Sequence, residues 1–499
     1  MRMKTTSLAF LLLLAACGSD EDLEPNGPGP TGGEDTAPPR SGTEPPAVAA
    51  LLDLAWSSTD YGQATYLSVG QLDWGPDSSL VVGSTIDDRS LSIFAPVGRI
   101  ERFAADGTRL WTTELAFDEF ADDLPVPPES DTVQIFGKAA HVASIDHTVE
   151  GTILVAFSVV LDYVDFEASS FITFSARSYI RSYDPDGNVL DTIALGGVTD
   201  FPVNDSVDEL AGITGIRALS DGSIAWTGAT SRGTHPAGSD ILVTEGSVGL
   251  LSADGTPQWT VVLGQELDFP NMVAPAEEIA VDVQPTPDGG LALRGQFYGT
   301  LTIGDLSATT EREGTFVARL DLDGTPTWLA TVDDSEPIGT GFAFPGMGID
   351  SAGNLFSASH LFEDSQDRLI QVGPDGQVVG HEVELDGVES LAVARDQIIV
   401  GGNALVEIAE DEYATPGKVE VREPDGAIVA SRSFATTPVL AGQSSRTFTV
   451  AASDDGRIAV GGTFNGAIDL GDGTVMIEPG VDIGAYVAVY EAPNGDDRD

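Results

Sequence analysis

Two hairpin signals alternate along this chain, and this internal repeat restricts the possible fold more than any other feature of the sequence. The first signal is a turn pair followed by a short apolar strand that often ends in Gly. It occurs seven times, at 76–84, 149–157, 220–228, 287–295, 351–359, 394–402 and 453–462. The second is an alternating strand, an Asp-Gly turn and another alternating strand. Six complete copies are present, at 99–115, 179–195, 247–263, 316–332, 369–385 and 419–435. Asp-Gly between alternating apolar runs is typical of a β-hairpin.

A seventh copy of the second signal is divided between the two ends of the chain. Residues 486–495 supply one strand and its turn, and the missing partner strand fits 51–59. Trp56 in that segment matches the Trp residues of the complete copies, namely Trp111, Trp259 and Trp328. The pattern predicts an all-β, seven-bladed β-propeller in which the N-terminal strand completes the last blade.

The repeat also explains why a ring is the expected arrangement. One four-stranded blade has two apolar faces and cannot bury both alone, whereas seven blades in a ring bury each face against a neighbour. A closed ring also has no weak terminal repeat of the kind that an open solenoid must cap. The 57 Gly and 29 Pro residues suit such a turn-rich β protein.

The first residues read as an export signal followed by a lipid attachment site. Arg2 and Lys4 precede an apolar run, Leu8 to Leu14, that is too short to span a membrane. Leu14-Ala15-Ala16-Cys17 resembles a bacterial lipoprotein lipobox, and Cys17 is the chain's only cysteine. The resemblance implies cleavage between Ala16 and Cys17, a diacylglycerol on the Cys17 thiol and acylation of its new amino terminus. An ordinary signal peptide with an incidental Cys is the alternative.

We therefore divide the chain into four parts. Residues 1–16 form the signal peptide, and 17–47 form a lipidated Cys with a tether rich in Pro, Gly and acidic residues, which is too polar to fold. Residues 48–495 form the propeller, and 496–499 form an acidic tail. Gly18 and Ser19, in place of an Asp, favour the outer membrane by resemblance to enteric lipoproteins.

The charge limits the partners that this chain can have. Lys and Arg number 23 against 79 Asp and Glu, which gives a formal net charge of −56. Phosphate binding depends on Lys and Arg, so we expect no nucleic-acid partner. Anionic lipid would repel the body, so the membrane is expected to hold the protein only through the lipid anchor. We read the acidity as a source of solubility, with salt adaptation as the alternative, and expect a monomer.

The body resembles bacterial surface β-propellers of the SBBP or delta-60 type. The best copy of their motif runs from Gly295 to Trp328 and is followed by Asp350 to Leu355. The resemblance covers most of 50–495 and implies the fold and export. It implies no reaction, because propellers host many unrelated functions.

Two turns and the Trp pattern invite more specific interpretations. The Asp-x-Asp-Gly sequences at 184–187 and 321–324 suggest calcium, but Gly falls fourth rather than sixth as in an EF-hand, so we predict hairpin turns. We expect no cofactor, with calcium binding at the surface left open. The Asp-Gly-Thr-x-x-Trp pattern lacks the residue between Asp and Gly that a sialidase Asp box needs. It is nearer to quinoprotein propellers, but we interpret the Trp residues as groups that pack blades together.

The histidines form no recognised catalytic motif. His141 and His147 flank Asp146 closely enough for a weak metal pair, and incidental placement is the alternative, so we assign no catalytic or metal residues. The aromatic run at 157–183 is either a ligand patch or a long hairpin with core aromatics, and we favour the hairpin.

The sequence thus predicts a non-catalytic binding or scaffold module, lipid-anchored at the cell envelope, with a protein or glycan ligand that it does not identify. Specificity is expected in the longest insertions, at 118–142, 158–175, 196–212 and 229–246. One alternative is a quinoprotein-like lipoprotein of outer-membrane assembly. Another is a hydrolase or lyase that uses a pair of carboxylates in the central channel.

Overall fold

A computed structural model describes residues 50–492 of this chain. The exceptions are connections at 61–65, 88–95, 125–132, 166–171, 196–207, 233–242, 267–278, 333–345, 362–365, 379–382, 386, 404–405, 410–411, 437–443 and 478–482. The signal segment, Ala16, Cys17, the tether and the acidic tail lie outside the described residues. Within the described part, no helix is long and apolar enough to cross a membrane.

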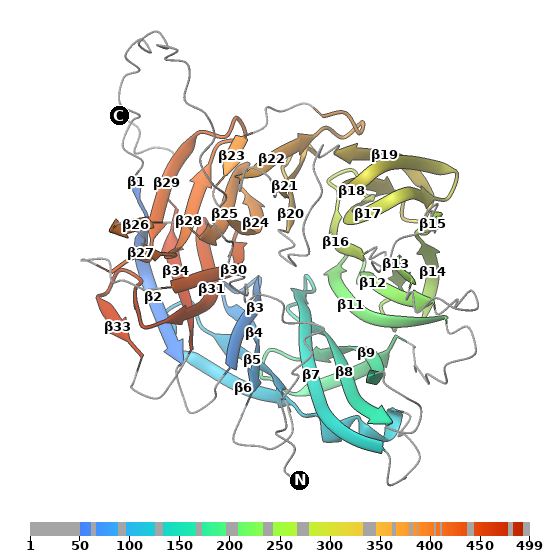
Figure 1. Cartoon of the computed structure of the whole chain (residues 1–499), viewed down its shortest axis with the longest axis horizontal. Coiled ribbons are helices and arrows are strands. Elements are labelled where there is room, and N and C mark those ends of the chain that lie inside the picture. Colours follow the sequence, from blue (N-terminus) through green and yellow to red (C-terminus); the bar gives the residue numbers. More distant parts are fainter. Residues whose placement is uncertain are drawn as a thin grey trace, which may run out of the picture.

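Seven antiparallel sheets of four strands stand in a ring, as predicted (Figure 1). We number the blades along the chain and give the innermost strand first. Blade 1 comprises β3 (Tyr66–Trp74), β4 (Leu80–Asp87), β5 (Val97–Phe103) and β6 (Arg109–Leu115). Blade 2 comprises β7 (Val133–His147), β8 (Ile153–Asp165), β9 (Ile172–Tyr183) and β10 (Val189–Ala194). Blade 3 comprises β11 (Asp208–Ala218), β12 (Ile224–Arg232), β13 (Val243–Leu251) and β14 (Pro257–Val262).

The remaining blades follow the same plan. Blade 4 comprises β16 (Ile279–Pro285), β17 (Leu291–Ile303), β18 (Leu306–Leu320) and β19 (Pro326–Val332). Blade 5 comprises β20 (Met347–Ile349), β21 (Leu355–Leu361), β22 (Gln366–Val372) and β23 (Val383–Leu385). Blade 6 comprises β24 (Val388–Ala394), β25 (Gln397–Asn403), β28 (Gly417–Arg422) and β29 (Ile428–Ser433). Blade 7 comprises β30 (Ser444–Ala452), β31 (Arg457–Asn465), β34 (Gly484–Glu491) and β2 (Asp53–Asp60).

Several short elements lie outside the four main strands of each blade. They are β1 (Ala50–Leu51), β15 (Gly264–Glu266), β26 (Val406–Ala409), β27 (Glu412–Ala414), β32 (Ala467–Asp469), β33 (Thr474–Met476) and the 3₁₀ turns η1 (Phe117–Glu119) and η2 (Ala121–Asp123).

The predicted closure of the ring is confirmed. Strand β2, from the start of the described chain, pairs antiparallel with β34 from its end (Figure 1). Trp56 lies opposite Val489, and Thr59 lies opposite Tyr486. The outermost strand of blade 7 therefore comes from the N-terminal part of the chain, which joins the ends without a covalent link.

A second attachment of the N-terminal segment was not predicted. Strand β1 adds to the outer edge of blade 6, where Ala50 and Leu51 pair in parallel with Ala430 and Ser431. Leu52, between β1 and β2, is fully buried. The first described residues thus connect blade 6 to blade 7 as well as completing blade 7.

The seven innermost strands surround the ring axis, and each contacts the next. The contacts run from β3 to β7, β11, β16, β20, β24, β30 and back to β3. Apolar side chains fill the space between adjacent sheets. One cluster, for example, joins Ala292 and Val317 of blade 4 to Met347, Leu355 and other residues of blade 5. Packing between blades, rather than within one, forms the core.

The two ends of the ring differ in the kind of connection that they carry. Tight turns join the first strand to the second in every blade and the third to the fourth in blades 1 to 6, and they lie at one end because consecutive strands are antiparallel. We call this end the turn face. The connections between second and third strands and between blades lie at the opposite end, the loop face. Loops there are longer and more varied in length.

Two of the insertions that we predicted as loops are partly strand. Residues 133–142 belong to β7, and the ends of β8 and β9 continue the pairing up to Val164 opposite Ile172. The prediction of loops at 118–142 and 158–175 was wrong to that extent, because pairing satisfies backbone groups that a loop would leave to water. The insertions at 196–212 and 229–246 lie partly outside the described residues, and 208–212, 229–232 and 243–246 belong to strands.

The Trp residues pack blades together, as predicted. Each indole nitrogen donates to a carbonyl in the outer turn of the next blade: Trp111 to Pro185 at 3.0 Å, Trp259 to Leu322 at 2.8 Å and Trp328 to Pro374 at 3.0 Å. The following Gly in each turn lies against the indole ring. The predicted hairpin turns at 184–187 and 321–324 are also confirmed, since Gly187 and Gly324 have φ of 87° and 84°.

The aromatic run contributes to the core of blade 2 where its side chains are described. Phe157 and Tyr179 are buried and stacked, with ring centroids 5.3 Å apart. Phe120, from the connection before blade 2, packs on both rings. These contacts support the predicted long hairpin over 157–183.

Candidate functional site

The inner strands share a bulge that turns polar groups toward the next blade. The pairing register shifts by one residue in six of the seven innermost strands, at Val69/Gln71, Val142/Ser144, Ile213/Gly215, Ala280/Asp282, Val388/Ser390 and Thr447/Thr449. Bulges bend a strand and redirect side chains.

The residue after the bulge accepts a hydrogen bond from the neighbouring inner strand in three joints. Ser144 accepts from the Ile216 N–H at 3.2 Å, Asp282 from the Met347 N–H at 3.2 Å, and Ser390 from the Val450 N–H at 3.0 Å. The bulge therefore links blades through side chain to backbone bonds.

Charged residues extend this linkage across blades 1 to 4. We call Asp73, Asp146, His147, Arg217 and Asp282 the axial belt. Asp73 of β3 lies 2.5 Å from Nδ1 of His147 on β7. Asp146, beside His147, accepts from the Ala218 N–H of β11 at 2.5 Å. Arg217, beside Ala218, lies 3.4 Å from Asp282 of β16. Acid and base thus alternate from blade to blade around part of the axis.

The belt contains one carboxyl group whose titration is strongly shifted. Burial raises the pKa of Asp146 to about 7, and the negative charge of Asp73 adds to the effect. The positive charge of Arg217 and the Ala218 N–H act in the opposite direction but do not cancel it. Asp146 therefore takes up a proton near neutral pH, so the charge of the belt depends on pH.

The imidazole of His147 bonds Asp73 through one nitrogen and is covered by the chain at the other. Nδ1 lies 2.5 Å from the Asp73 carboxylate and donates to it. Nε2 is buried, without a hydrogen-bond partner among the described residues. A Cβ built on Gly75 would lie 3.2 Å from Nε2, which shows how closely the chain covers it. The imidazole therefore positions Asp73 rather than presenting a base to a ligand.

Two members of the belt keep contact with solvent. The side chain of Asp73 is 26% exposed and that of Arg217 is 24% exposed, whereas that of His147 is only 5% exposed. A ligand near the axis would therefore meet one carboxylate and one guanidinium. The sequence analysis did not find the axial belt, because its residues are far apart in the sequence. A shared position could have indicated it: Asp73, Asp146 and Arg217 each stand five residues before the inner-turn residue with positive φ, which is Ser78, Gly151 or Gly222.

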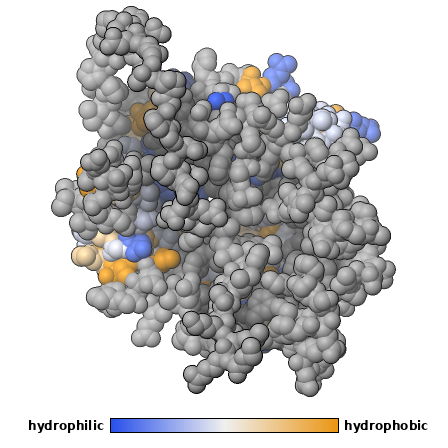
Figure 2. Space-filling model, in the orientation of Figure 1, coloured by the Kyte–Doolittle hydropathy of each residue, from blue (hydrophilic) through white to orange (hydrophobic). Residues whose placement is uncertain are grey.

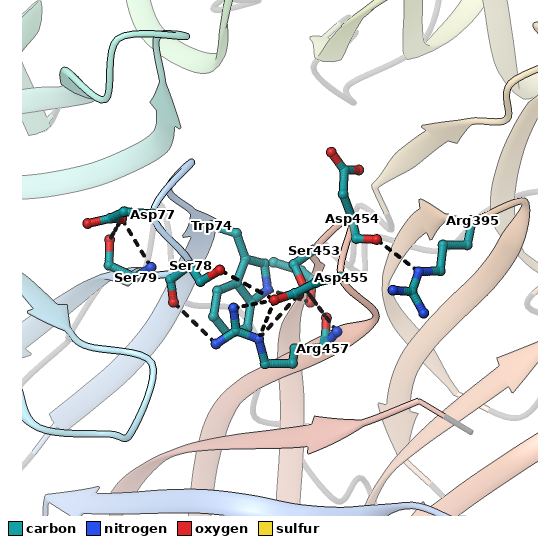
Figure 3. Close-up of polar contacts among 10 residues, drawn as sticks. Trp74, Asp77, Ser78, Ser79, Arg395, Ser453, Asp454, Asp455 and Arg457 are labelled. Carbon is teal, nitrogen blue, oxygen red and sulfur yellow. Dashed lines mark hydrogen bonds and ion pairs between the residues drawn. The ribbon is translucent and has the colours of Figure 1, made fainter. Parts of the chain in front are cut away.

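A second polar cluster joins blade 7 to blade 1 at the turn face (Figure 3). Arg457 forms an ion pair with Asp455 at 2.6 Å and stacks over the Trp74 ring, with its guanidinium carbon 4.7 Å from the centroid. It also donates to the Ser78 carbonyl at 3.3 Å, and Ser78 Oγ donates to Asp455. The Arg457 guanidinium is the main cause of the fall in the Asp455 pKa to about 2.

This cluster serves the closure of the ring. Trp74 also donates to the Ala451 carbonyl of β30 at 3.3 Å. Trp74 follows Asp73 on β3, so alternation sends one side chain toward blade 7 and the other toward blade 2.

The possible metal pair of the sequence is not assembled. Asp146 and His147 bond different neighbours, and burial lowers the pKa of His141 to about 4. Among the described residues, no group of three or more His, Cys, Asp or Glu side chains could hold a metal ion. Cys17 and Ala16 remain predictions, since they lie outside the described part.

Comparisons with known proteins find only distant structural likenesses. No family model and no curated protein matches this chain. A protein of unknown function from Dyadobacter fermentans is similar in structure, with 10% identity, a TM-score of 0.41 and coverage of 89% of this chain and 99% of the other. The β-propeller domain of the Trilobed protease from Pyrococcus furiosus shows 9% identity, a TM-score of 0.39 and coverage of 84% and 97%. For virginiamycin B lyase from Staphylococcus aureus the values are 10%, 0.39, 86% and 98%. This chain is a seven-bladed β-propeller.

Proposed function

We propose that this protein is a lipid-anchored scaffold that binds a protein or glycan of the cell envelope through the loop face of its propeller, without catalysis. The observation that carries the proposal is the asymmetry of the ring. Twelve hydrogen-bonded turns and the two-residue turn between Ala394 and Gln397 close the turn face, whereas the longest connections between strands lie on the loop face. Rigid scaffolds usually place recognition on such loops.

The axial belt supports a structural role for the charged groups near the axis. Its carboxylates bond backbone N–H groups or cations of adjacent blades, and its imidazole is covered. These groups are occupied in joining inner strands, which leaves recognition to the loops.

The anchor is tested separately from the binding. Cells grown with a palmitate analogue should label the wild-type protein and not a Cys17→Ser variant, and the label should bring the protein into the detergent phase. Ser19→Ala is the matched control and should label normally. Labelling of the Cys17→Ser variant at the wild-type level would contradict the anchor.

The binding is tested on the purified mature protein against a glycan array and immobilised outer-membrane vesicles. We expect saturable binding that is lost when residues 404–416, which hold the β26–β27 hairpin, are replaced by a two-residue turn. Asp73→Asn and Asp146→Asn should leave binding intact. Binding that depends on the belt and ignores the loop would oppose the proposal.

A second candidate is the hydrolase or lyase predicted from propeller enzymes. The partial exposure of Asp73 and the Asp146 pKa of about 7 favour it, because a general acid or base titrates near its working pH. Turnover of any substrate that Asp73→Asn abolishes, without loss of folding, would establish this alternative. Capture of an outer-membrane β-barrel partner would instead favour the assembly role.

A further inference from the structure

Two joints of the ring are built alike but differ in how completely they are filled. In both joints an Arg stands five residues before the Gly of the outer turn. It is Arg102, before Gly107, in blade 1 and Arg319, before Gly324, in blade 4. Each reaches the Asp of its own inner turn, since Arg102 contacts Asp77 at 2.6 Å and Arg319 contacts Asp288 at 2.6 Å. In both joints a Trp donates to a Pro carbonyl of the next blade at 3.0 Å.

At the joint between blades 1 and 2 the guanidinium of Arg102 is fully paired. Its Nε donates to Ser79 Oγ at 3.0 Å, and Nη1 donates to the Pro185 carbonyl. Val81 and Tyr183, both buried, complete the packing, and Tyr183 stacks on Trp111 with centroids 6.1 Å apart. The Arg102 guanidinium thus has an acceptor at each of its three nitrogens.

At the joint between blades 4 and 5 smaller residues stand at the corresponding places. Gly290 replaces Ser79, Ala292 replaces Val81, and Val372 replaces Tyr183. Arg319 keeps only its bond to Asp288, and its Nε is buried without a partner among the described residues. A cavity of about 80 Å³ remains, lined by Arg319, Trp328 and Asp288 with Ala292, Leu355 and Pro374.

The lining indicates the chemistry of an occupant. The rim is exposed at Pro287, Asp288 and Ala352, whereas Ala292 and Leu355 at the floor are buried. The walls are mostly apolar. The polar group among them is the Arg319 guanidinium, whose side chain is 16% exposed and pairs with Asp288. Asp288 already balances the Arg319 charge, and the whole chain carries −56, so an anion gains little here. A small uncharged group with a carbonyl oxygen and a methyl fits these demands.

We propose that the cavity between blades 4 and 5, on the turn face, binds an acetamido group such as that of an N-acetylated amino sugar. The carbonyl oxygen accepts from the Arg319 guanidinium, which turns slightly toward it, and the methyl packs on Ala292 and the Trp328 ring. This site lies at the opposite end of the ring from the loops, so it is independent of the function proposed above.

Saturation-transfer NMR on the mature protein with N-acetylglucosamine tests the assignment. We expect binding with a Kd of roughly 1 mM, as befits so few contacts, and the strongest saturation at the acetyl methyl protons. Ala292→Val, which installs the side chain of Val81, should weaken binding at least tenfold without lowering the melting temperature. Val81→Ala, at the filled joint, is the matched control and should leave binding unchanged.

Two outcomes would overturn the proposal. No binding, or binding that Ala292→Val does not weaken, would remove the site, while the loop-face proposal would be untouched. Equal competition by acetate would show that the cavity selects a carboxylate and would refute the assignment of an uncharged group. Arg319→Lys should also weaken binding, because it keeps the charge beside Asp288 but loses the planar donor fork.

Discussion

Ser79 shows how much a single hydroxyl contributes at a blade joint. The residue is buried, accepts from Arg102 Nε at 3.0 Å and donates to Asp77 at 2.6 Å. Ser223 holds the corresponding place in blade 3 and bonds Asp221, but Leu250 stands there in place of Arg102. The two serines therefore differ mainly in the contact with a buried guanidinium.

We expect Ser79→Ala to lower the free energy of unfolding by about 1–3 kcal/mol, because it leaves Arg102 Nε buried without an acceptor. Ser223→Ala, the matched control, should cost less. Urea unfolding followed by tryptophan fluorescence measures both. Equal losses in the two variants would show that the bond to Arg102 adds nothing.

Asp146 gives a prediction about pH. Its pKa is about 7 in the folded protein and about 3.8 without the surrounding structure, so the folded state binds the proton more tightly. The stabilising contribution of this group to the free energy of unfolding is therefore complete below about pH 4 and is lost as the pH rises through 7. Asp146→Asn, which can still accept from the Ala218 N–H, should remove this loss.

The measurement is the free energy of unfolding at pH 5, 6, 7 and 8 for both proteins. Other carboxyl groups with lowered pKa values, such as Asp455, gain their contribution below this range and do not mask the effect. The wild type should lose of the order of 1 kcal/mol or more relative to Asp146→Asn between pH 5 and 8. Parallel curves would contradict the shift.

At the scale of elements, the outer turns depend on glycine for two separable reasons. Gly324 has φ of 84°, and a Cβ there would lie 2.9 Å from the Trp259 ring. Gly289, in an inner turn, has φ of 90° but open space around the position of a Cβ. The pair separates the cost of the backbone conformation from the cost of displacing the indole.

Gly289→Ala should destabilise the protein by about 1–2 kcal/mol, the cost of the left-handed conformation alone. Gly324→Ala should cost clearly more, since the Trp259 ring must move and its bond to the Leu322 carbonyl is weakened. Chemical denaturation compares them, and similar losses would mean that the indole adapts freely.

The strand order was predictable because its signals are local. Each Asp-Gly turn sets a hairpin, and the recurring Trp identified the strand that completes blade 7, so the pairing of β2 with β34 followed from the repeat. The axial belt was not predictable, because Asp73 and His147 meet only through bulges that change which way a side chain points. Strand β1 was missed because a two-residue parallel pair leaves no pattern.

At the scale of the whole molecule, stability depends on joining the two ends of the ring. Ser57 lies opposite Ala488 in the β2–β34 pair, so cysteines at both places are close enough for a disulfide. In a form without Cys17, Ser57→Cys with Ala488→Cys should raise the melting temperature under oxidising conditions only. The expected gain is about 4–5 kcal/mol, because the bond closes nearly the whole chain.

The matched control shifts the pair by one residue, to Ser57→Cys with Val487→Cys. Adjacent side chains point to opposite faces of a strand, so this pair should stay reduced or form mixed products. Disulfide formation in the control and not in the first variant would contradict the register of the closure.

Nine large apolar side chains are exposed among the described residues. On the face in view, Figure 2 shows hydrophobic groups in small separate areas, the clearest near the β32–β33 hairpin, where Met476 is 63% exposed. Patches of this size are ordinary on soluble domains.

The position of β1 and β2 also determines when these two strands can pair during synthesis of the chain. The segment that finishes blade 7 and borders blade 6 is synthesised before its partners β29 and β34, which follow more than 370 residues later. This segment must therefore wait, unpaired, until both partners have been made. A ribosome-stalled product that ends before β34 should remain sensitive to protease near residue 56, whereas the released protein should be protected there.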